Sequence, residues 1–274
     1  MEKLIITAAL VGAEVTRQQT PFLPYSPREI AAEAKRVWDA GASIVHLHMR
    51  DASGNPSSDK TLFAETISYI RSETDLIIQV STGGALGMTA SQRIQPVTLA
   101  PEMASVSTGS VNFGKDVFSN PLPMVREFVR ICNRHHVKPE IEVFDSSMVE
   151  NALLLTQEGL LRPPLHFNFV LGVPGGMAAT ARNLLFLLQL IPQASTWTIS
   201  GIGRHQLTMN ALGILLAGHV RTGLEDNIFW RKGELAKGNA PFVERLVQLA
   251  GSLDRPVAAP HEAREILKLD DFAS

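Results

Sequence analysis

Two histidines separated by a single residue, His46 and His48, are the side chains of this sequence best suited to chemistry. They follow the apolar run Ser43–Val45, and Arg50 and Asp51 come directly after them. If this run is a strand, residues two apart point to the same side, and both imidazoles leave one face at its C-terminal end. Two neutral imidazoles on one rigid element are typical of a His₂-carboxylate zinc site. The alternative is a pair of core histidines bonded to backbone carbonyls.

A zinc site of this kind needs a carboxylate from elsewhere in the chain, and Glu225 and Asp226 are the candidates. They follow the last apolar run, His219–Thr222. One carboxylate can complete the zinc site, while the other acts as a base or orients Arg221. The alternative is a solvated pair of surface acids.

The elements that would position these residues alternate regularly along the chain. Eight short apolar runs are typical of strands buried on both faces: Leu4–Ala9, Ser43–His48, Leu76–Ser81, Met103–Ser107, Pro139–Phe144, Leu165–Leu171, Thr196–Ser200 and His219–Thr222. Helical patterns lie between them, at Ser26–Ala40, Lys60–Ser72, Thr89–Pro96, Met124–His135, Ser147–Gln157, Ala178–Leu190, His205–Leu216 and Pro241–Ser252. This alternation predicts a (β/α)₈ TIM barrel. A doubly wound open sheet is the alternative, but the first strand is not followed by a G-x-G-x-x-G fingerprint.

Composition limits the classes of function. The 274 residues are 45% hydrophobic with a formal net charge of −2, which gives no indication of a nucleic-acid partner or an anionic membrane. The single cysteine, Cys132, excludes an internal disulfide and fits a cytoplasmic protein. We expect neither a signal peptide nor a membrane span. We expect one barrel domain over residues 1–274, with residues from about 254 forming a C-terminal helical arm.

In a barrel of this kind the active site lies at the C-terminal ends of the strands. Polar residues gather at these ends: Glu14, Ser81–Gly84, Ser105, Ser107, Glu142 and the glycine-rich loops Gly172–Gly176 and Gly201–Gly203. The hydroxyls and bare amides of Ser81–Gly84 suit a carboxylate or carbonyl oxygen, and a plain turn is the alternative. The late glycine loops suit a phosphorylated carrier such as coenzyme A, or are simply tight turns. Glu14 favours a cationic group on the substrate, unless it forms a surface salt bridge with Arg17.

Six strand-end motifs occur in order along the chain. They are Thr7-Ala8-Ala9 with Gly12-Ala13-Glu14, His46-Leu47-His48-Met49-Arg50, Gln79-Val80-Ser81-Thr82-Gly83-Gly84, Pro101–Ser105 with Gly109–Gly114, Leu171–Gly176, and His219-Val220-Arg221 with Gly223–Asn227. In this combination the chain resembles the β-keto acid cleavage enzymes over essentially its whole length. The resemblance is greatest to members that act on 3-keto-5-aminohexanoate in lysine fermentation.

The resemblance implies a zinc-dependent (β/α)₈ barrel, usually a homotetramer, that converts a β-keto acid and acetyl-CoA into acetoacetate and a new acyl-CoA. Position by position, it implies that His46, His48 and Glu225 bind zinc and that Arg221 and Asp226 form the catalytic pair. It places Glu14, Ser81, Gly84, Ser105, Ser107 and Glu142 in the substrate pocket. The two serines Ser105 and Ser107 depart from the threonine and asparagine expected there in the family.

The residues are consistent with this chemistry. Zinc can polarise a ketone, and Asp226, held by Arg221, can remove the α-proton. The expected product from 3-keto-5-aminohexanoate is 3-aminobutyryl-CoA. One rival is a metal-dependent hydrolase, although those barrels usually carry the His-x-His pair on the first strand. The other rival is a non-catalytic protein that binds an acyl-CoA or a keto acid.

Overall fold

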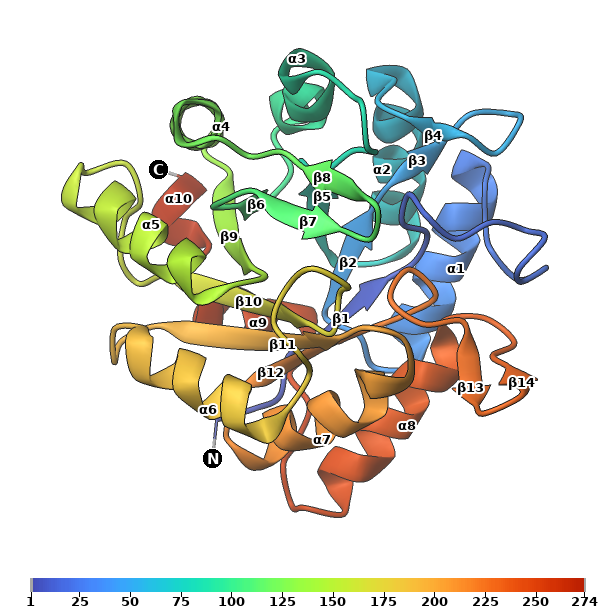
Figure 1. Ribbon diagram of the computed structural model, residues 1–274. Coiled ribbons are helices and arrows are strands. Elements are labelled where there is room, and N and C mark those ends of the chain that lie inside the picture. Colours follow the sequence, from blue (N-terminus) through green and yellow to red (C-terminus); the bar gives the residue numbers. More distant parts are fainter. Residues whose placement is uncertain (1, 274) are drawn as a thin grey trace.

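The computed structural model describes residues 2–273 and shows a closed barrel of eight parallel strands (Figure 1). Around the barrel the strands follow the order β1-β12-β11-β10-β9-β6-β5-β2. Their bounds are β1 Ile6–Ala9, β2 Ile44–Leu47, β5 Ile77–Ser81, β6 Met103–Ser107, β9 Lys138–Val143, β10 His166–Leu171, β11 Thr196–Gly201 and β12 His219–Thr222. The predicted (β/α)₈ fold is confirmed, and all eight expected strands are present to within two residues at either end.

Helices surround the barrel in a ring (Figure 1). Their bounds are α1 Pro27–Asp39, α2 Lys60–Glu73, α3 Ala90–Ile94, α4 Leu122–Arg134, α5 Ser146–Gln157, α6 Ala181–Leu190, α7 Gln206–Leu215, α8 Ala240–Gly251, α9 Pro260–Leu267 and α10 Asp270–Ala273. Local signals set their ends: Ser26 and Glu29 form a capping box at the start of α1, and Thr180 caps α6. Within residues 2–273, none of these helices has the length and hydropathy to cross a membrane.

The sequence patterns did not predict three short hairpins. They are β3 Met49–Arg50 with β4 Pro56–Ser57, β7 Val111–Phe113 with β8 Asp116–Phe118, and β13 Phe229–Arg231 with β14 Glu234–Leu235. Two of them turn on two-residue loops whose glycines, Gly114 and Gly233, have positive φ. Such loops are the usual sequence signal of a hairpin. The predicted helix Thr89–Pro96 is also interrupted, because α3 passes into the 3₁₀ helix η1, Gln95–Leu99.

The C-terminal residues cover the N-terminal end of the barrel strands, which is the end opposite the expected active site. Val257 pairs with Leu4 beside β1, and Leu267 packs with Ile44 and Met103 in one apolar cluster. The predicted C-terminal helical arm contains two short helices, α9 and α10. The arm therefore does not cover the opposite mouth of the barrel, where the strands have their C-terminal ends.

Candidate active site

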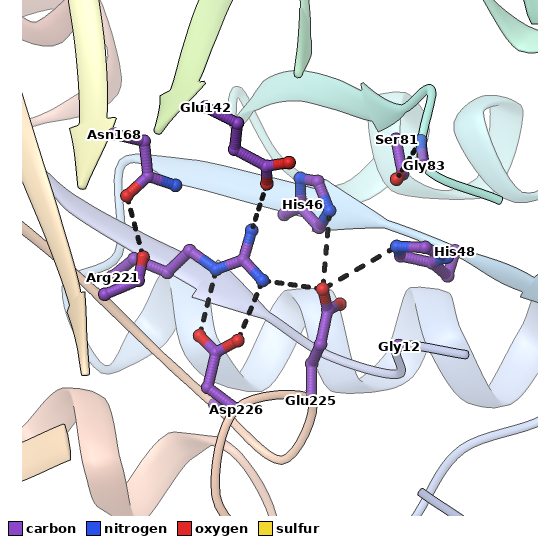
Figure 2. Close-up of polar contacts among 12 residues, drawn as sticks. Gly12, His46, His48, Ser81, Gly83, Glu142, Asn168, Arg221, Glu225 and Asp226 are labelled. Carbon is purple, nitrogen blue, oxygen red and sulfur yellow. Dashed lines mark hydrogen bonds and ion pairs between the residues drawn. The ribbon is translucent and has the colours of Figure 1, made fainter. Parts of the chain in front are cut away.

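His46, His48 and Glu225 come together at the C-terminal mouth of the barrel (Figure 2). Each histidine presents its Nε2 to the Glu225 Oε1 at 3.6 Å, and the three ligand atoms lie within 4.8 Å of one another. Nitrogen and oxygen ligands about 2 Å from a tetrahedral zinc are roughly 3.3 Å apart. The other Glu225 oxygen, Oε2, is buried without a hydrogen-bond partner among the described residues. The donor set and its spacing therefore fit zinc.

Two glycines allow Glu225 to reach the histidines. A Cβ at Gly12, which has a φ of +64°, would lie 2.6 Å from the Glu225 Cγ. At Gly223, with a φ of +143°, a Cβ would lie 2.1 Å from the carbonyl oxygen of Ala9. Only glycine fits both the backbone angle and the space at these positions. The loop after β12 can therefore fold closely over β1 and point Glu225 toward β2.

The protonation states of the triad also suit a metal. Burial lowers the pKa of His46 to about 4, and it lowers the pKa of His48 as well, so both imidazoles are neutral near pH 7. Burial raises the pKa of Glu225, but the charge of the Arg221 guanidinium outweighs it and holds the pKa at about 2. Two neutral imidazoles and one carboxylate are the forms in which these groups bind a metal.

Gln79 on β5, to which the sequence patterns assign no role, fixes the orientation of His46. Its Oε1 lies 2.6 Å from the His46 Nδ1. Because the Nε2 faces the site, the Nδ1 carries the hydrogen and donates it to Gln79. Gln79 pairs with His46 in the register of β5 and β2. The alternation of side chains along β5 could have indicated that Gln79 and Ser81 point to the same side of the strand.

Arg221 and Asp226 form a buried bidentate ion pair beside the triad. The Arg221 Nε donates to the Asp226 Oδ2 at 2.9 Å, and its Nη2 donates to Asp226 Oδ1 at 2.8 Å and to Glu225 Oε1 at 2.6 Å. Burial raises the pKa of Asp226, although Arg221 opposes the shift. A carboxylate with a raised pKa is a stronger base while it remains ionised, which suits removal of a carbon-bound proton.

Glu142 on β9 lies on the other side of Arg221, with its Oε1 3.8 Å from the Arg221 Nη1. Burial raises its pKa to about 7, against the opposing influences of Arg221 and Ser107. The Ser107 Oγ donates to its Oε2 at 2.7 Å. Ser107 is therefore bonded to another side chain, and it would act on a substrate through Glu142.

A cavity of about 280 Å³, the barrel cavity, opens from these residues toward solvent. Three phenylalanines form one wall: Phe113 and Phe118 from the β7–β8 hairpin and Phe144 after β9. Their neighbouring ring centroids are 6.3 and 6.1 Å apart. The hairpin lies across the mouth of the barrel in Figure 1, where the Gly114 N–H donates to the carbonyl of Pro174. The cavity thus combines a charged floor with an aromatic wall.

The other expected substrate-binding residues divide into two groups. Glu14, Ser81, Gly84 and Glu142 line the barrel cavity. Ser105 and Ser107 do not appear in its lining; both are buried on β6, and the Ser105 hydroxyl has no hydrogen-bond partner among residues 2–273.

The loop that carries Glu14 is held by Arg50. This buried side chain donates to the carbonyls of Gly12 and Val15, both at 2.7 Å. Arg17 pairs with Glu29 at 2.8 Å. Glu14 is exposed at the mouth and makes no ion pair among the described residues.

Comparison with known proteins shows the family and the fold of the chain. A family model described as beta-keto acid cleavage enzyme matches residues 3–269. The chain is 51% identical over 271 residues to the 3-keto-5-aminohexanoate cleavage enzyme of Fusobacterium nucleatum, covering 98% of this chain and 99% of the relative. It is 39% identical over 270 residues to the 3-oxoadipate:acetyl-CoA acetyltransferase of Cupriavidus necator, covering 97% and 94% of the two chains.

The apo structure of ObcA shares the fold, with a TM-score of 0.76 and 21% identity. The match covers 90% of this chain and 65% of the ObcA chain. The family model and both relatives match nearly the whole sequence. This chain therefore belongs to the β-keto acid cleavage enzyme family.

Proposed function

We propose that this enzyme is zinc-dependent and exchanges acyl groups between 3-keto-5-aminohexanoate and acetyl-CoA, giving acetoacetate and 3-aminobutyryl-CoA. The observation that carries the proposal is the buried Arg221–Asp226 pair, which adjoins the His46–His48–Glu225 triad at the floor of the barrel cavity. The names of the Fusobacterium nucleatum and Cupriavidus necator relatives supply the substrate classes.

His46, His48 and Glu225 would hold the zinc. A bound zinc ion acts as a Lewis acid that polarises a ketone and so makes the neighbouring C–H bond more acidic. Gln79 keeps the His46 Nε2 directed at the site, and Arg221 shares the Glu225 oxygen that both histidines face.

Asp226 would move the proton. It takes a proton from C2 of the β-keto acid, and the resulting carbanion forms a bond with the carbonyl carbon of acetyl-CoA as the coenzyme A thiolate leaves. The thiolate then attacks C3, the original ketone carbon, and the C2–C3 bond breaks. Asp226 returns its proton to C2, which releases acetoacetate and leaves the remainder as the new acyl-CoA. Arg221 holds the carboxylate in place throughout, through its two hydrogen bonds to Asp226.

Ser81 and Gly84 lie where they can bind the keto acid near the triad, since both line the barrel cavity. The Ser81 Oγ accepts the Gly83 N–H at 3.0 Å, which leaves its own hydrogen free to donate. Glu142 would complete the polar side of the pocket, with Ser107 bonded behind it and Ser105 buried on the neighbouring strand β6. Glu14 lies at the mouth of the cavity and would bind the ammonium group at the distal end of the substrate.

The test of this proposal is incubation of the purified zinc-loaded enzyme with acetyl-CoA and 3-keto-5-aminohexanoate, with acetoacetate as the readout. We expect one acetoacetate for each acetyl-CoA consumed, and no product when acetyl-CoA is omitted. A metal-dependent hydrolase would instead cleave its substrate without acetyl-CoA. A protein that only binds acyl-CoA would form no acetoacetate at all.

The same assay tests the substrate assignment through Glu14. A charge-assisted hydrogen bond to an ammonium is worth about 1.5–3 kcal/mol once the bound substrate shields it from water, or roughly tenfold to a hundredfold in kcat/KM. We expect the wild type to prefer 3-keto-5-aminohexanoate over the neutral 3-ketohexanoate by about this factor. Glu14→Gln should remove most of the preference, whereas the surface control Glu73→Gln should keep it. An unchanged ratio in Glu14→Gln would contradict the role of Glu14.

We also propose that the enzyme is a homotetramer of the single barrel domain and its C-terminal arm. Several large apolar side chains are exposed on the outer helices, among them Leu185 and Phe186 on α6 and Leu215 on α7. Trp230, on the β13–β14 hairpin, packs on Phe242 of its own chain and does not add to this exposed apolar surface. We expect light scattering at micromolar concentration to give about four times the chain mass of 29.9 kDa. A value for a single chain would reject the assembly.

A further inference from the structure

A second and larger cavity, the outer cavity, lies outside the barrel wall. It has a volume of about 720 Å³, within the usual range for ligand pockets. Its walls come from the start of α7, the β13–β14 hairpin and α8, and include Arg204, Asn210, Phe229, Arg231, Lys232 and Arg245. None of the described residues that line it belongs to the metal triad or to the Arg221–Asp226 pair. The active site therefore leaves this cavity unexplained.

The two cavities share a wall. Ile202 lines the barrel cavity and Gly203 lines the outer cavity, while Asp226 and Asn227 divide in the same way. The Gly203 N–H donates to the Asp226 carbonyl at 2.7 Å, so the two chain segments meet between the cavities. A ligand that reached from one cavity into the other would therefore have to cross this contact.

Asn210 gives the outer cavity an unsatisfied polar group. Asn210 is one of the residues that line the cavity and is 1% exposed, yet neither its amide oxygen nor its amide nitrogen has a hydrogen-bond partner among the described residues. A buried polar group without a partner is costly, which favours a ligand that supplies one. A free primary amide offers one acceptor and two donors, the pattern that pairs with the N6 and N7 edge of adenine.

The outer cavity is also positively charged, although the whole chain has a net charge of −2. Its described lining contains Arg204, Arg231, Lys232 and Arg245 and no acidic residue. Arg231 pairs with Glu234, and the Arg245 guanidinium stacks on Trp230. Arg204 and Lys232 are exposed and have no carboxylate within 4.0 Å among residues 2–273. They are therefore free to bind phosphate groups.

We propose that the outer cavity binds the 3′-phosphorylated adenosine diphosphate part of coenzyme A. Asn210 pairs with the adenine edge, the half-exposed Phe229 offers an aromatic face to the base, and Arg204 and Lys232 bind the phosphates. The pantetheine arm passes over the Gly203–Asp226 contact and brings the thioester into the barrel cavity. This inference rests on the proposed use of acetyl-CoA.

The first test measures turnover by the double variant Arg204→Gln/Lys232→Gln. Loss of two charge-assisted phosphate contacts should raise the KM for acetyl-CoA by roughly tenfold to a hundredfold, with little change in the KM for the β-keto acid. The matched control Arg182→Gln/Lys237→Gln changes the overall charge equally but lies outside both cavities. For S-acetylpantetheine, which lacks the nucleotide, we expect the two double variants to have similar kcat/KM values. Equal KM values for acetyl-CoA in the two variants would overturn the inference while leaving the proposed function intact.

The second test needs no turnover and uses adenosine 3′,5′-bisphosphate as the probe in titration calorimetry. We expect the wild type to bind it in competition with coenzyme A, and Asn210→Leu to weaken binding at least tenfold. Leucine has a similar shape and no unpaired polar atoms, so the unliganded variant should keep or gain thermal stability. Binding that does not compete with coenzyme A would indicate a separate nucleotide site and overturn the inference. Phe229→Ser gives another outcome that would overturn the inference. If this variant has a lower oligomer mass and an unchanged KM for acetyl-CoA, a second copy of the chain occupies the cavity instead of coenzyme A.

Discussion

Asp226→Asn is expected to lower kcat by about 10²–10⁴-fold, the range attributed to a single general base. The variant should bind zinc at the wild-type level, because the ligand atoms of His46, His48 and Glu225 are untouched. Its KM values should change little, since the proton transfer occurs only in the transition state. The measurement is steady-state acetoacetate formation together with the zinc content of the same preparation.

The surface control for this variant is Asp39→Asn, because Asp39 is exposed on α1 and, within residues 2–273, forms an ion pair only with Lys35. Wild-type turnover by Asp226→Asn would show that another group removes the proton. Arg221 is better tested with lysine than with alanine, since its guanidinium is buried against Glu225 and Asp226. Removing that charge would leave buried carboxylates unpaired, at a cost of about 3–5 kcal/mol in stability.

His48→Ala should reduce bound zinc from about one per chain to nearly none and abolish turnover. Two remaining ligands hold zinc far more weakly than three, because a catalytic zinc site normally uses three protein ligands and one open position. His48 is the preferred target of the pair, since its side chain is 12% exposed against 1% for His46. The smaller loss of packing should leave the fold intact.

Elemental analysis and circular dichroism of the same sample separate metal loss from unfolding. The matched control is His261→Ala, because His261 is an exposed histidine at the opposite end of the barrel, on α9. Undiminished zinc in a folded His48→Ala protein would reject the assignment of the triad. If the variant loses zinc but keeps full activity, the reaction does not require the metal.

Much of the fold could be predicted from local patterns. A parallel strand that is buried on both faces has a continuous run of apolar residues, which can be recognised in the sequence. Capping residues such as Ser26 mark where a helix begins. The hairpins at Gly114 and Gly233 carried a usable signal, but their strands are only two or three residues long. Periodicity cannot be recognised over so few residues.

The candidate site divides in the same way. Alternation along β2 was enough to predict that His46 and His48 share a side, and their position relative to the barrel mouth followed from the strand end. Which carboxylate would face them depends on the closing of β12 on β1 and on the two glycines that let the Glu225 loop pass close to Ala9.

The sequence by itself thus determined the eight strands, their helices and the strand-end polar residues, because each depends on a few neighbouring positions. Only the tertiary structure decided that Gln79 supports His46, that Ser107 is bonded to Glu142, and that the buried Asn210 amide finds no partner among residues 2–273 at a cationic cavity. The physical reason is that these contacts join side chains far apart in the sequence. Their partners are fixed by the register and closure of the barrel, which no local pattern encodes.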